Sequence, residues 1–196
     1  MTRVLVVCTG NICRSPMAEV LLRARLHAEG IGDRVSVSSV GTRAMIGQPM
    51  TRQAARQALD LGARWSDVVD HTARQLDEHA LRTADLVLAM TRDHRRTIVQ
   101  LRPQSVASTF TLREFVRLAA SADLRFEADL GTDDRVRSLM TRIVAGRGAV
   151  AKPAEASEND VSDPYRRGDA AYRRAAEQIS PAVDVVAGLL RAVGPH

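Results

Sequence analysis

The chain has 196 residues, enough for one domain with a sizeable core, and its aromatic content of 3% leaves that core to Leu, Val, Ile and Ala. It contains no apolar run of about 18 residues and no signal-peptide-like start, so we expect neither a membrane span nor a secretory leader. The net charge of +5 comes from arginines scattered among acidic residues without interleaved aromatics. This pattern argues against a nucleic-acid-binding protein and suits attraction of acidic, phosphorylated substrates.

Hydrophobic patterning predicts strands and helices that alternate along the chain. The expected strands cover residues 3–8, 35–40, 84–90 and 105–110. The expected helices cover residues 16–29, Thr51 to about Gly62, 92–101, a stretch that begins at Thr111, 133–145, and 169–192 with a kink or break at Ser180-Pro181. This alternation is typical of an α/β fold in which a parallel sheet carries helices on both faces.

The segment between the first strand and the first helix carries the strongest functional signal. It reads Cys-Thr-Gly-Asn-Ile-Cys-Arg-Ser over residues 8–15. We expect Ser15 to cap the following helix and Pro16 to be its first residue. A strand, a glycine-containing loop and a helix start direct several backbone N–H groups to one point, an arrangement that binds phosphate or a similar oxyanion. The expected phosphate-binding residues are Thr9, Gly10, Asn11, Ile12, Cys13, Arg14 and Ser15.

Three side chains of this loop suit phosphoryl transfer. A cysteine attacks as a thiolate, and a helix N-terminus together with a nearby guanidinium favours that form of Cys8. Arg14 stays charged and can hold two phosphate oxygens in a bidentate fashion. Ser15 can donate a hydrogen bond to the sulfur. The alternative is a buried, inert cysteine beside an ordinary turn, and the full set of residues argues against it.

Residues 7–19, which contain this loop, closely resemble the signature of the low-molecular-weight protein tyrosine phosphatase family. Further resemblances follow in order at 38–42, 71–76, 84–90 and 163–165. The resemblance implies a single domain over residues 1–196, with three layers and a doubly wound, four-stranded parallel sheet in the order 2-1-3-4. Residues near 121–160 have no counterpart in the resemblance, which predicts a flexible insertion there. The small and polar residues at 146–162 agree with a loop.

The resemblance implies a catalytic acid. Asp163, which Pro164 follows, matches the segment that carries the family's general acid. Other carboxylates compete with it only as ordinary surface groups; these are Asp133, Asp134, Asp160 and Asp169. With Cys8 and Arg14, Asp163 would catalyse hydrolysis through a cysteinyl-phosphate intermediate and without a cofactor.

The resemblance also implies a supporting residue behind the loop. His71 is expected to hydrogen-bond there in a network with Asn11 and Ser15, and is not expected to act as a general base. An incidental histidine is the alternative. The five histidines are scattered without the spacing of metal ligands, so we expect no metal site.

Four side chains are expected to form the wall of the substrate pocket: Ile12, Met45, Ile46 and Tyr165. Tyrosine phosphatases of this family commonly have an aliphatic residue at the position of Ile12, whereas related phosphoarginine phosphatases carry Thr. Family members often place Trp or Tyr after the second strand, where this chain has Met45 and Ile46. Many also have two tyrosines after Asp-Pro, whereas here Arg166 follows Tyr165.

The sequence therefore favours a protein tyrosine phosphatase that acts on a phosphotyrosine protein or peptide, with a tyrosine kinase as a candidate partner. The enzymatic alternatives are a phosphatase for phosphoarginine or small phosphomonoesters, and an arsenate reductase coupled to an external thiol. A phosphate-loop protein that only binds or regulates is the alternative outside enzymes, and the presence of Cys8, Arg14 and Asp163 argues against it.

The use of cysteine bears on location and regulation. Both cysteines lie in the loop, which argues against a disulfide framework and for a reducing, cytoplasmic location. Because Cys13 is close to Cys8, it is a redox candidate that could capture an oxidised Cys8 as a disulfide. A small apolar filler beneath the loop is the alternative role for Cys13.

Overall fold

The fold was analysed in a computed structural model that describes residues 1–121, 132–148, 150–151 and 153–193. Its centre is a parallel sheet built from β1 (Thr2–Cys8), β2 (Val35–Gly41), β3 (Leu86–Ala89) and β4 (Thr109–Thr111). The strands lie in the order β2-β1-β3-β4, and each neighbouring pair is parallel. This confirms the predicted fold class and strand order.

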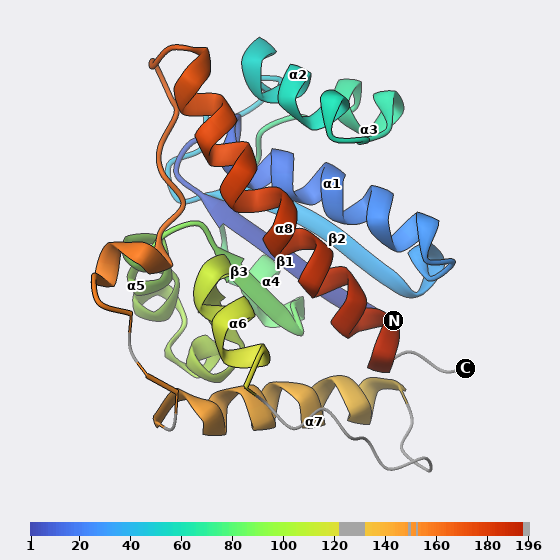
Figure 1. Cartoon of the computed structure of the whole chain (residues 1–196), viewed down its shortest axis with the longest axis vertical. Helices are drawn as coiled ribbons and strands as arrows, with labels where there is room; N and C mark the ends of the chain where they lie inside the picture. Colours follow the sequence, from blue (N-terminus) through green and yellow to red (C-terminus); the bar gives the residue numbers. More distant parts are fainter. Residues whose placement is uncertain (122–131, 149, 152, 194–196) are drawn as a thin grey trace.

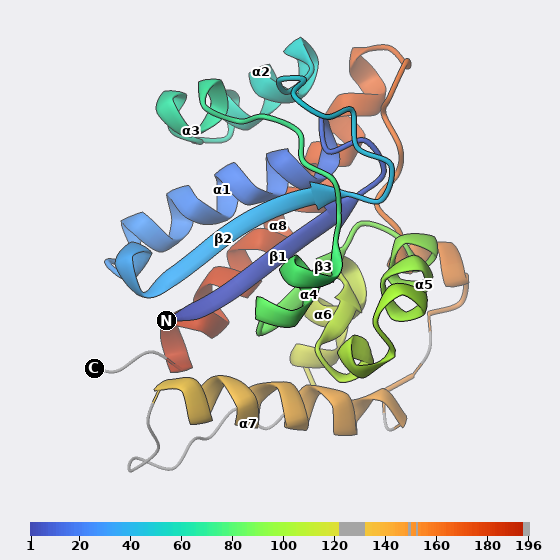
Figure 2. The same cartoon turned by 180° about the vertical axis from the view of Figure 1, so that it is seen from behind.

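Helices cover both faces of the sheet (Figures 1 and 2). Their bounds are α1 Arg14–Ala28, α2 Arg52–Asp60, α3 Trp65–Val69, α4 Glu78–Thr83, α5 Arg92–Leu101, α6 Leu112–Ala119, α7 Thr132–Ala145 and α8 Asp169–Val193. Successive side chains of β1 point to opposite faces. Val4 and Val6 belong to the larger core, which includes residues of α1, α6, α7 and α8, whereas Leu5 and Val7 pack with residues of α4 and α5.

The predicted start of the first helix is wrong by two residues. Helix α1 begins at Arg14, its N-cap is Cys13, and no side chain caps it. Ser15 is the second helical residue, and its hydroxyl contacts the Cys8 sulfur and caps no backbone N–H of the helix. Pro16 is tolerated inside the first turn, where the backbone N–H has no partner within the helix.

Other predicted elements differ in extent. The fourth strand starts at Thr109, because residues Pro103–Ala107 form a 3-10 helix that begins at the proline. Helix α8 continues through Pro181, so of the predicted kink or break the break is absent. The patterning did not predict the short helices α3 and α4. The helix predicted over 92–101 is confirmed at both ends by α5.

The region of the predicted insertion is partly described. Helix α7 lies within it, and the expected loop at 146–162 contains short 3-10 helices at Gly146–Gly148 and Ala156–Asn159. Residues 122–131, 149 and 152 lie outside the described part of the chain, so the flexible insertion stays a prediction. Within the described residues, no helix is both long and apolar enough to cross a bilayer.

The ends of β1 and β2 are joined to the loop that follows β1. Cys8 pairs with Gly41 at the carboxyl ends of the two strands. Beyond this pair, the N–H of Thr42 donates to the carbonyl oxygen of Cys8, and that of Arg43 to the carbonyl oxygen of Thr9, both at 2.9 Å. A β-carbon on Gly41 would overlap with the Thr9 carbonyl oxygen. The glycine therefore lets the segment after β2 run directly alongside the loop.

Candidate active site

A cavity of about 190 Å³ opens at the carboxyl end of β1. Its lining consists of Cys8, Thr9, Gly10, Ile12, Cys13, Arg14, Arg43, Met45, Asp163 and Tyr165. In parallel α/β sheets, ligands bind at this end of the strands. The structure thus brings the predicted nucleophile, arginine and acid to one cavity, although they span more than half of the chain.

The sulfur of Cys8 is held by neighbouring polar groups. Its Sγ lies 2.9 Å from the Ser15 hydroxyl, and the backbone N–H of Asn11 donates to it at 3.3 Å. Helix α1 begins at Arg14, so its N-terminus lies in the same loop. The sulfur of the predicted nucleophile is thus fixed in position by hydrogen-bonding groups of its own loop.

Arg14 joins the loop to the predicted acid. Its Nη2 forms an ion pair with Asp163 Oδ2 at 3.1 Å, and its Nη1 donates to the carbonyl oxygen of Val161 at 3.3 Å. The Arg14 side chain is 5% exposed, whereas that of Asp163 is 51% exposed. The Nε of Arg14 is buried without a hydrogen-bond partner. The guanidinium therefore has a donor that the protein itself does not use.

A buried network behind the loop fixes its shape. Asn11 adopts a left-handed backbone conformation with φ of 56°, which asparagine tolerates better than most residues. Its Nδ2 donates to Ser15 Oγ at 2.9 Å and to Ser39 Oγ at 2.7 Å, while its Oδ1 accepts from the N–H of Arg74 at 2.8 Å. Both the NH₂ group and the oxygen of the Asn11 side-chain amide thus have hydrogen-bond partners, which hold this residue in its strained backbone conformation.

His71 contacts the same asparagine. Its Nε2 lies 2.8 Å from the carbonyl oxygen of Asn11, and its Nδ1 lies 3.6 Å from Glu19 Oε2. Glu19 in turn accepts a hydrogen bond from the Ser39 hydroxyl. The expected link from His71 to Ser15 therefore runs through Asn11. Sequence reasoning missed Glu19 and Ser39, although a lone glutamate on the apolar face of the first helix was an available signal.

A second buried histidine contacts another residue of the loop, and the sequence did not predict it. His94 Nε2 lies 2.8 Å from Thr9 Oγ1, and His94 Nδ1 lies 2.8 Å from Thr91 Oγ1. Burial, assisted by the positive charge of Arg14, lowers the pKa of His94 to about 4. The ring is therefore neutral near pH 7. No local pattern indicates this contact, because it joins residues 85 positions apart.

Cys13 also lines the cavity but has different neighbours from Cys8. Its Sγ lies 3.4 Å from Thr51 Oγ1 and 3.6 Å from the Tyr172 hydroxyl. Burial raises the pKa of the Cys13 thiol and raises that of Tyr172 to about 12. Both cysteines are free thiols. Cys13 is thus protonated near neutral pH, which suits a resting role as a small buried group.

The segment that carries Asp163 is held by three elements. Asp160 accepts hydrogen bonds from the backbone N–H and the guanidinium of Arg92 in α5, at 2.8 and 2.9 Å. The N–H of Val161 donates to the carbonyl oxygen of Met90 after β3 at 2.8 Å. Gln178 Oε1 in α8 accepts from both the N–H and the hydroxyl of Ser162 at 2.9 Å.

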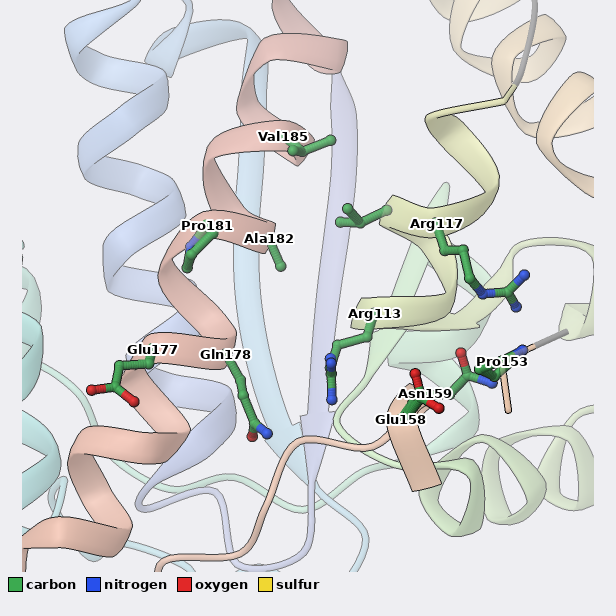
Figure 3. A pocket seen from close by; sticks show the side chains of 11 residues that line it. Arg113, Arg117, Pro153, Glu158, Asn159, Glu177, Gln178, Pro181, Ala182 and Val185 are labelled. Atoms are coloured by element: carbon green, nitrogen blue, oxygen red, sulfur yellow. The ribbon is translucent and has the colours of Figure 1, made fainter. Parts of the chain in front are cut away.

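Residues of α6, of α8 and of the chain between Pro153 and Asn159 line a separate cavity of about 420 Å³ (Figure 3). Two of its lining residues, Gln178 and Arg113, hold the backbone next to the predicted acid. Arg113 donates to the carbonyl oxygen of Asp160 at 3.3 Å. The acid segment is thus held by two residues that line a cavity other than that of Cys8.

The competing carboxylates lie elsewhere. Asp160 pairs with Arg92, and Asp169 lines a different cavity with Tyr172 and Arg173. The side chains of Asp133 and Asp134 lie outside the described part of the structure. Of the described carboxylates, Asp163 is the one in the lining of the Cys8 cavity.

Three of the four expected wall residues line the cavity. Ile12 is buried, while Met45 and Tyr165 are partly exposed at its mouth. Ile46 does not line the cavity, and 70% of its surface is exposed. Its prediction as a wall residue is wrong: Ile46 and Gly47, whose φ is 77°, are the central residues of a turn that the Gln48 N–H closes on the Met45 carbonyl oxygen at 3.0 Å. Within the described residues, no group of three or more His, Cys, Asp or Glu side chains is placed to hold a metal ion.

This fold and this loop define a class of enzyme, and comparisons with known proteins agree. Residues 3–143 match the family model described as low molecular weight phosphotyrosine protein phosphatase. The chain is 30% identical to the probable low molecular weight protein-tyrosine-phosphatase EpsP of Ralstonia nicotianae, over 97% of both chains. The chain belongs to the low-molecular-weight phosphotyrosine protein phosphatase family, and it is a phosphatase.

Further relatives show the range of the family. The chain is 35% identical to the protein-arginine-phosphatase of Bacillus subtilis, over 58% of this chain and 70% of that protein. The crystal structure of the low molecular weight protein tyrosine phosphatase from T. tengcongensis superimposes with a TM-score of 0.67. It has 32% sequence identity and covers 95% of this chain and 97% of its own.

The buried network predicts a stability effect at Ser39. Ser39→Ala removes the hydroxyl that donates to Glu19 and accepts from Asn11, so each of these two buried polar groups loses one hydrogen bond. We expect the free energy of unfolding to fall by about 1–3 kcal/mol, as measured by urea denaturation. Ser38→Ala, on the same strand but outside the network, is the control and should change stability by less than about 0.5 kcal/mol. Equal effects of the two substitutions would contradict the importance of the network.

Proposed function

We propose that this chain is a protein tyrosine phosphatase in which Cys8, Arg14 and Asp163 carry out the reaction. The observation that carries the proposal is the lining of one cavity by the thiol, the guanidinium and the carboxyl group. Membership of the phosphatase family supports the same reaction.

In the first step, the Cys8 thiolate attacks phosphorus in line with the leaving oxygen and forms a cysteinyl phosphate. The loop N–H groups and Arg14 stabilise the charge on the equatorial oxygens of the transition state. Protonated Asp163 donates its proton to the leaving phenolate oxygen, because a phenol leaves far more easily than a phenolate. The sulfur becomes bonded to phosphorus, and the phenol departs.

In the second step, the Asp163 carboxylate takes a proton from a water molecule that attacks the phosphorus. The P–S bond breaks, and the products are inorganic phosphate and the regenerated thiolate. Ser15, 2.9 Å from the sulfur, stabilises the thiolate as a leaving group by donating a hydrogen bond. Asn11 and His71 support the loop from behind and take no part in proton transfer.

Phosphotyrosine is the substrate that the cavity favours. Ile12 and Met45 give it apolar walls, and Tyr165 at its mouth can contact an aromatic ring. A phosphoarginine phosphatase is the second candidate, because one relative is named a protein-arginine-phosphatase. Arsenate reduction has less support, since the chain has no cysteine outside the loop to relay electrons.

A reducing, cytoplasmic location suits this chemistry, because an oxidised Cys8 cannot attack phosphorus. A tyrosine kinase that phosphorylates the same substrate is the natural partner of such an enzyme.

The function is tested by comparing peptides that carry phosphotyrosine, phosphoserine or phosphoarginine. We expect the highest kcat/KM for phosphotyrosine, without added metal, and no measurable turnover by Cys8→Ser. Faster release of phosphate from phosphoarginine would move the assignment to the second candidate. Persistent turnover by Cys8→Ser would exclude the cysteinyl-phosphate mechanism.

The role of Asp163 gives a prediction that depends on the leaving group. Asp163→Asn cannot protonate the leaving oxygen, so kcat for phenyl phosphate should fall by about 10²–10⁴-fold. The loss should be smaller for p-nitrophenyl phosphate, whose leaving group needs less protonation. Asp169→Asn, outside the cavity, is the matched control and should keep full activity. An equal loss on both substrates would argue against an acid role.

We also propose that Cys13 protects Cys8 from irreversible oxidation by forming a disulfide with it. The supporting observations are that both thiols are free and line the same cavity. Peroxide followed by dithiothreitol should restore the activity of the wild-type enzyme, whereas Cys13→Ala should recover poorly. Activity is read with an aryl phosphate, and equal recovery of the two proteins would refute a protective role.

A further inference from the structure

A hydrogen-bonded chain of three side chains reaches the cavity from α5. Thr91 caps that helix, and its Oγ1 lies 2.8 Å from His94 Nδ1. The other ring nitrogen, Nε2, lies 2.8 Å from Thr9 Oγ1. Thr9 belongs to the cavity lining. The mechanism described above gives none of these three side chains a role.

The neutral ring restricts how the hydrogens are placed. One nitrogen of a neutral imidazole donates and the other accepts, so the chain has two possible arrangements. In the first, Nδ1–H donates to Thr91, and the Thr9 hydroxyl donates to Nε2. In the second, the Thr91 hydroxyl donates to Nδ1, and Nε2–H donates to Thr9. Thr91 can take part in the second because its Oγ1 also accepts the N–H of His94 at 3.3 Å and keeps its own hydrogen.

The two arrangements present different groups to the cavity. In the first, the hydrogen of the Thr9 hydroxyl is used by His94, so only oxygen lone pairs remain for a ligand. In the second, that hydrogen is free to donate. A phosphoryl group carries negative oxygens, which lone pairs repel and a hydroxyl hydrogen attracts. An anion in the cavity therefore stabilises the second arrangement selectively.

We propose that a bound phosphoryl group holds His94 in its Nε2–H tautomer, so that Thr9 donates a hydrogen bond to a phosphoryl oxygen. Thr9 then contacts the substrate, and His94 and Thr91 are positioning residues that act through it. Both arrangements contain the same protons, so the change is a shift between tautomers of a neutral ring and consumes no reactant. This inference rests on the proposed phosphatase function, and it adds two residues of the α5 N-terminus to the groups that support phosphate binding.

The low pKa of His94, about 4, bears on the charge of the ring. The ring stays neutral at the pH where such an enzyme works, so it must accept at one nitrogen. Arg14 contributes to that shift, which also indicates that the ring lies within the electrostatic field of the phosphate-binding arginine.

The tautomer can be observed directly by ¹⁵N NMR of histidine-labelled protein. The chain has five histidines, and His94→Gln identifies the signals of the ring in question. We expect inorganic phosphate to shift the ring toward Nε2–H, or to leave it there if it already has that form. A ring that carries its proton on Nδ1 in the phosphate complex would overturn the proposal.

Substitutions provide a second test, with the affinity for inorganic phosphate measured by competition against an aryl phosphate. Thr9→Val should weaken phosphate binding by about tenfold, the size expected for one hydrogen bond to a charged group. Thr9→Ser should retain it. Thr91→Val should also weaken binding, and the double substitution should be no worse than Thr9→Val, because the three groups act as one chain. Additive losses would contradict the proposal.

Thr91 also caps helix α5, so the control variant must remove a helix cap and leave the hydrogen bonds between Thr91, His94 and Thr9 intact. Thr111 caps α6 by accepting from the N–H of Glu114. Thr111→Val should lower the melting temperature much as Thr91→Val does, yet leave phosphate affinity unchanged. A wild-type protein that neither binds phosphate nor hydrolyses aryl phosphates would refute the proposed function itself. A normal wild type with a fully active Thr9→Val would refute only the role of Thr9.

Discussion

The hydrogen bonds of Asn11 are the constraint on which the rest of the site depends. A loop that directs its N–H groups to one point needs a residue with positive φ, and Asn11 adopts it in this chain. Its amide contacts helix α1, strand β2 and the segment of Arg74, so three separate parts of the chain hold one strained residue. The cavity owes its form to this buried polar cluster as much as to the apolar core beneath it.

The segment with Asp163 shows how the acid reaches the loop from far along the chain. Asp160, Val161 and Ser162 are bound respectively by α5, the end of β3 and α8. Each bond uses a polar group of the backbone or of a neighbouring side chain. The segment before Asp163 has few apolar residues, and hydrogen bonds to neighbouring elements hold it in place.

Local sequence patterns predicted the fold class and the residues of the phosphate-binding loop. The apolar run of β1 and the alternation of elements predicted a parallel sheet, whereas its strand order came from the family resemblance. Helix α5 was predicted at both ends because its cap and periodicity are local. Ser15 was wrongly predicted as the helix cap because a serine before a proline is a strong cap signal. In the structure its hydroxyl contacts the Cys8 sulfur. His94 and Ser39 could not be predicted, since their partners come together only in the folded chain. Ile46 was misassigned because the sequence reasoning did not recognise the turn over Met45–Gln48, in which this side chain is exposed.

The ion pair between Arg14 and Asp163 has a consequence for how the resting enzyme meets its substrate. The guanidinium of Arg14 already has a negative partner. A phosphate dianion must therefore replace the Asp163 carboxylate at this guanidinium. As the dianion takes over the guanidinium, the carboxylate loses its counter-ion and faces a second negative group. Under the proposed mechanism, the ion pair therefore links substrate entry to the release of Asp163 from Arg14. The carboxyl group becomes free to face the leaving oxygen at the moment when the phosphoryl group arrives.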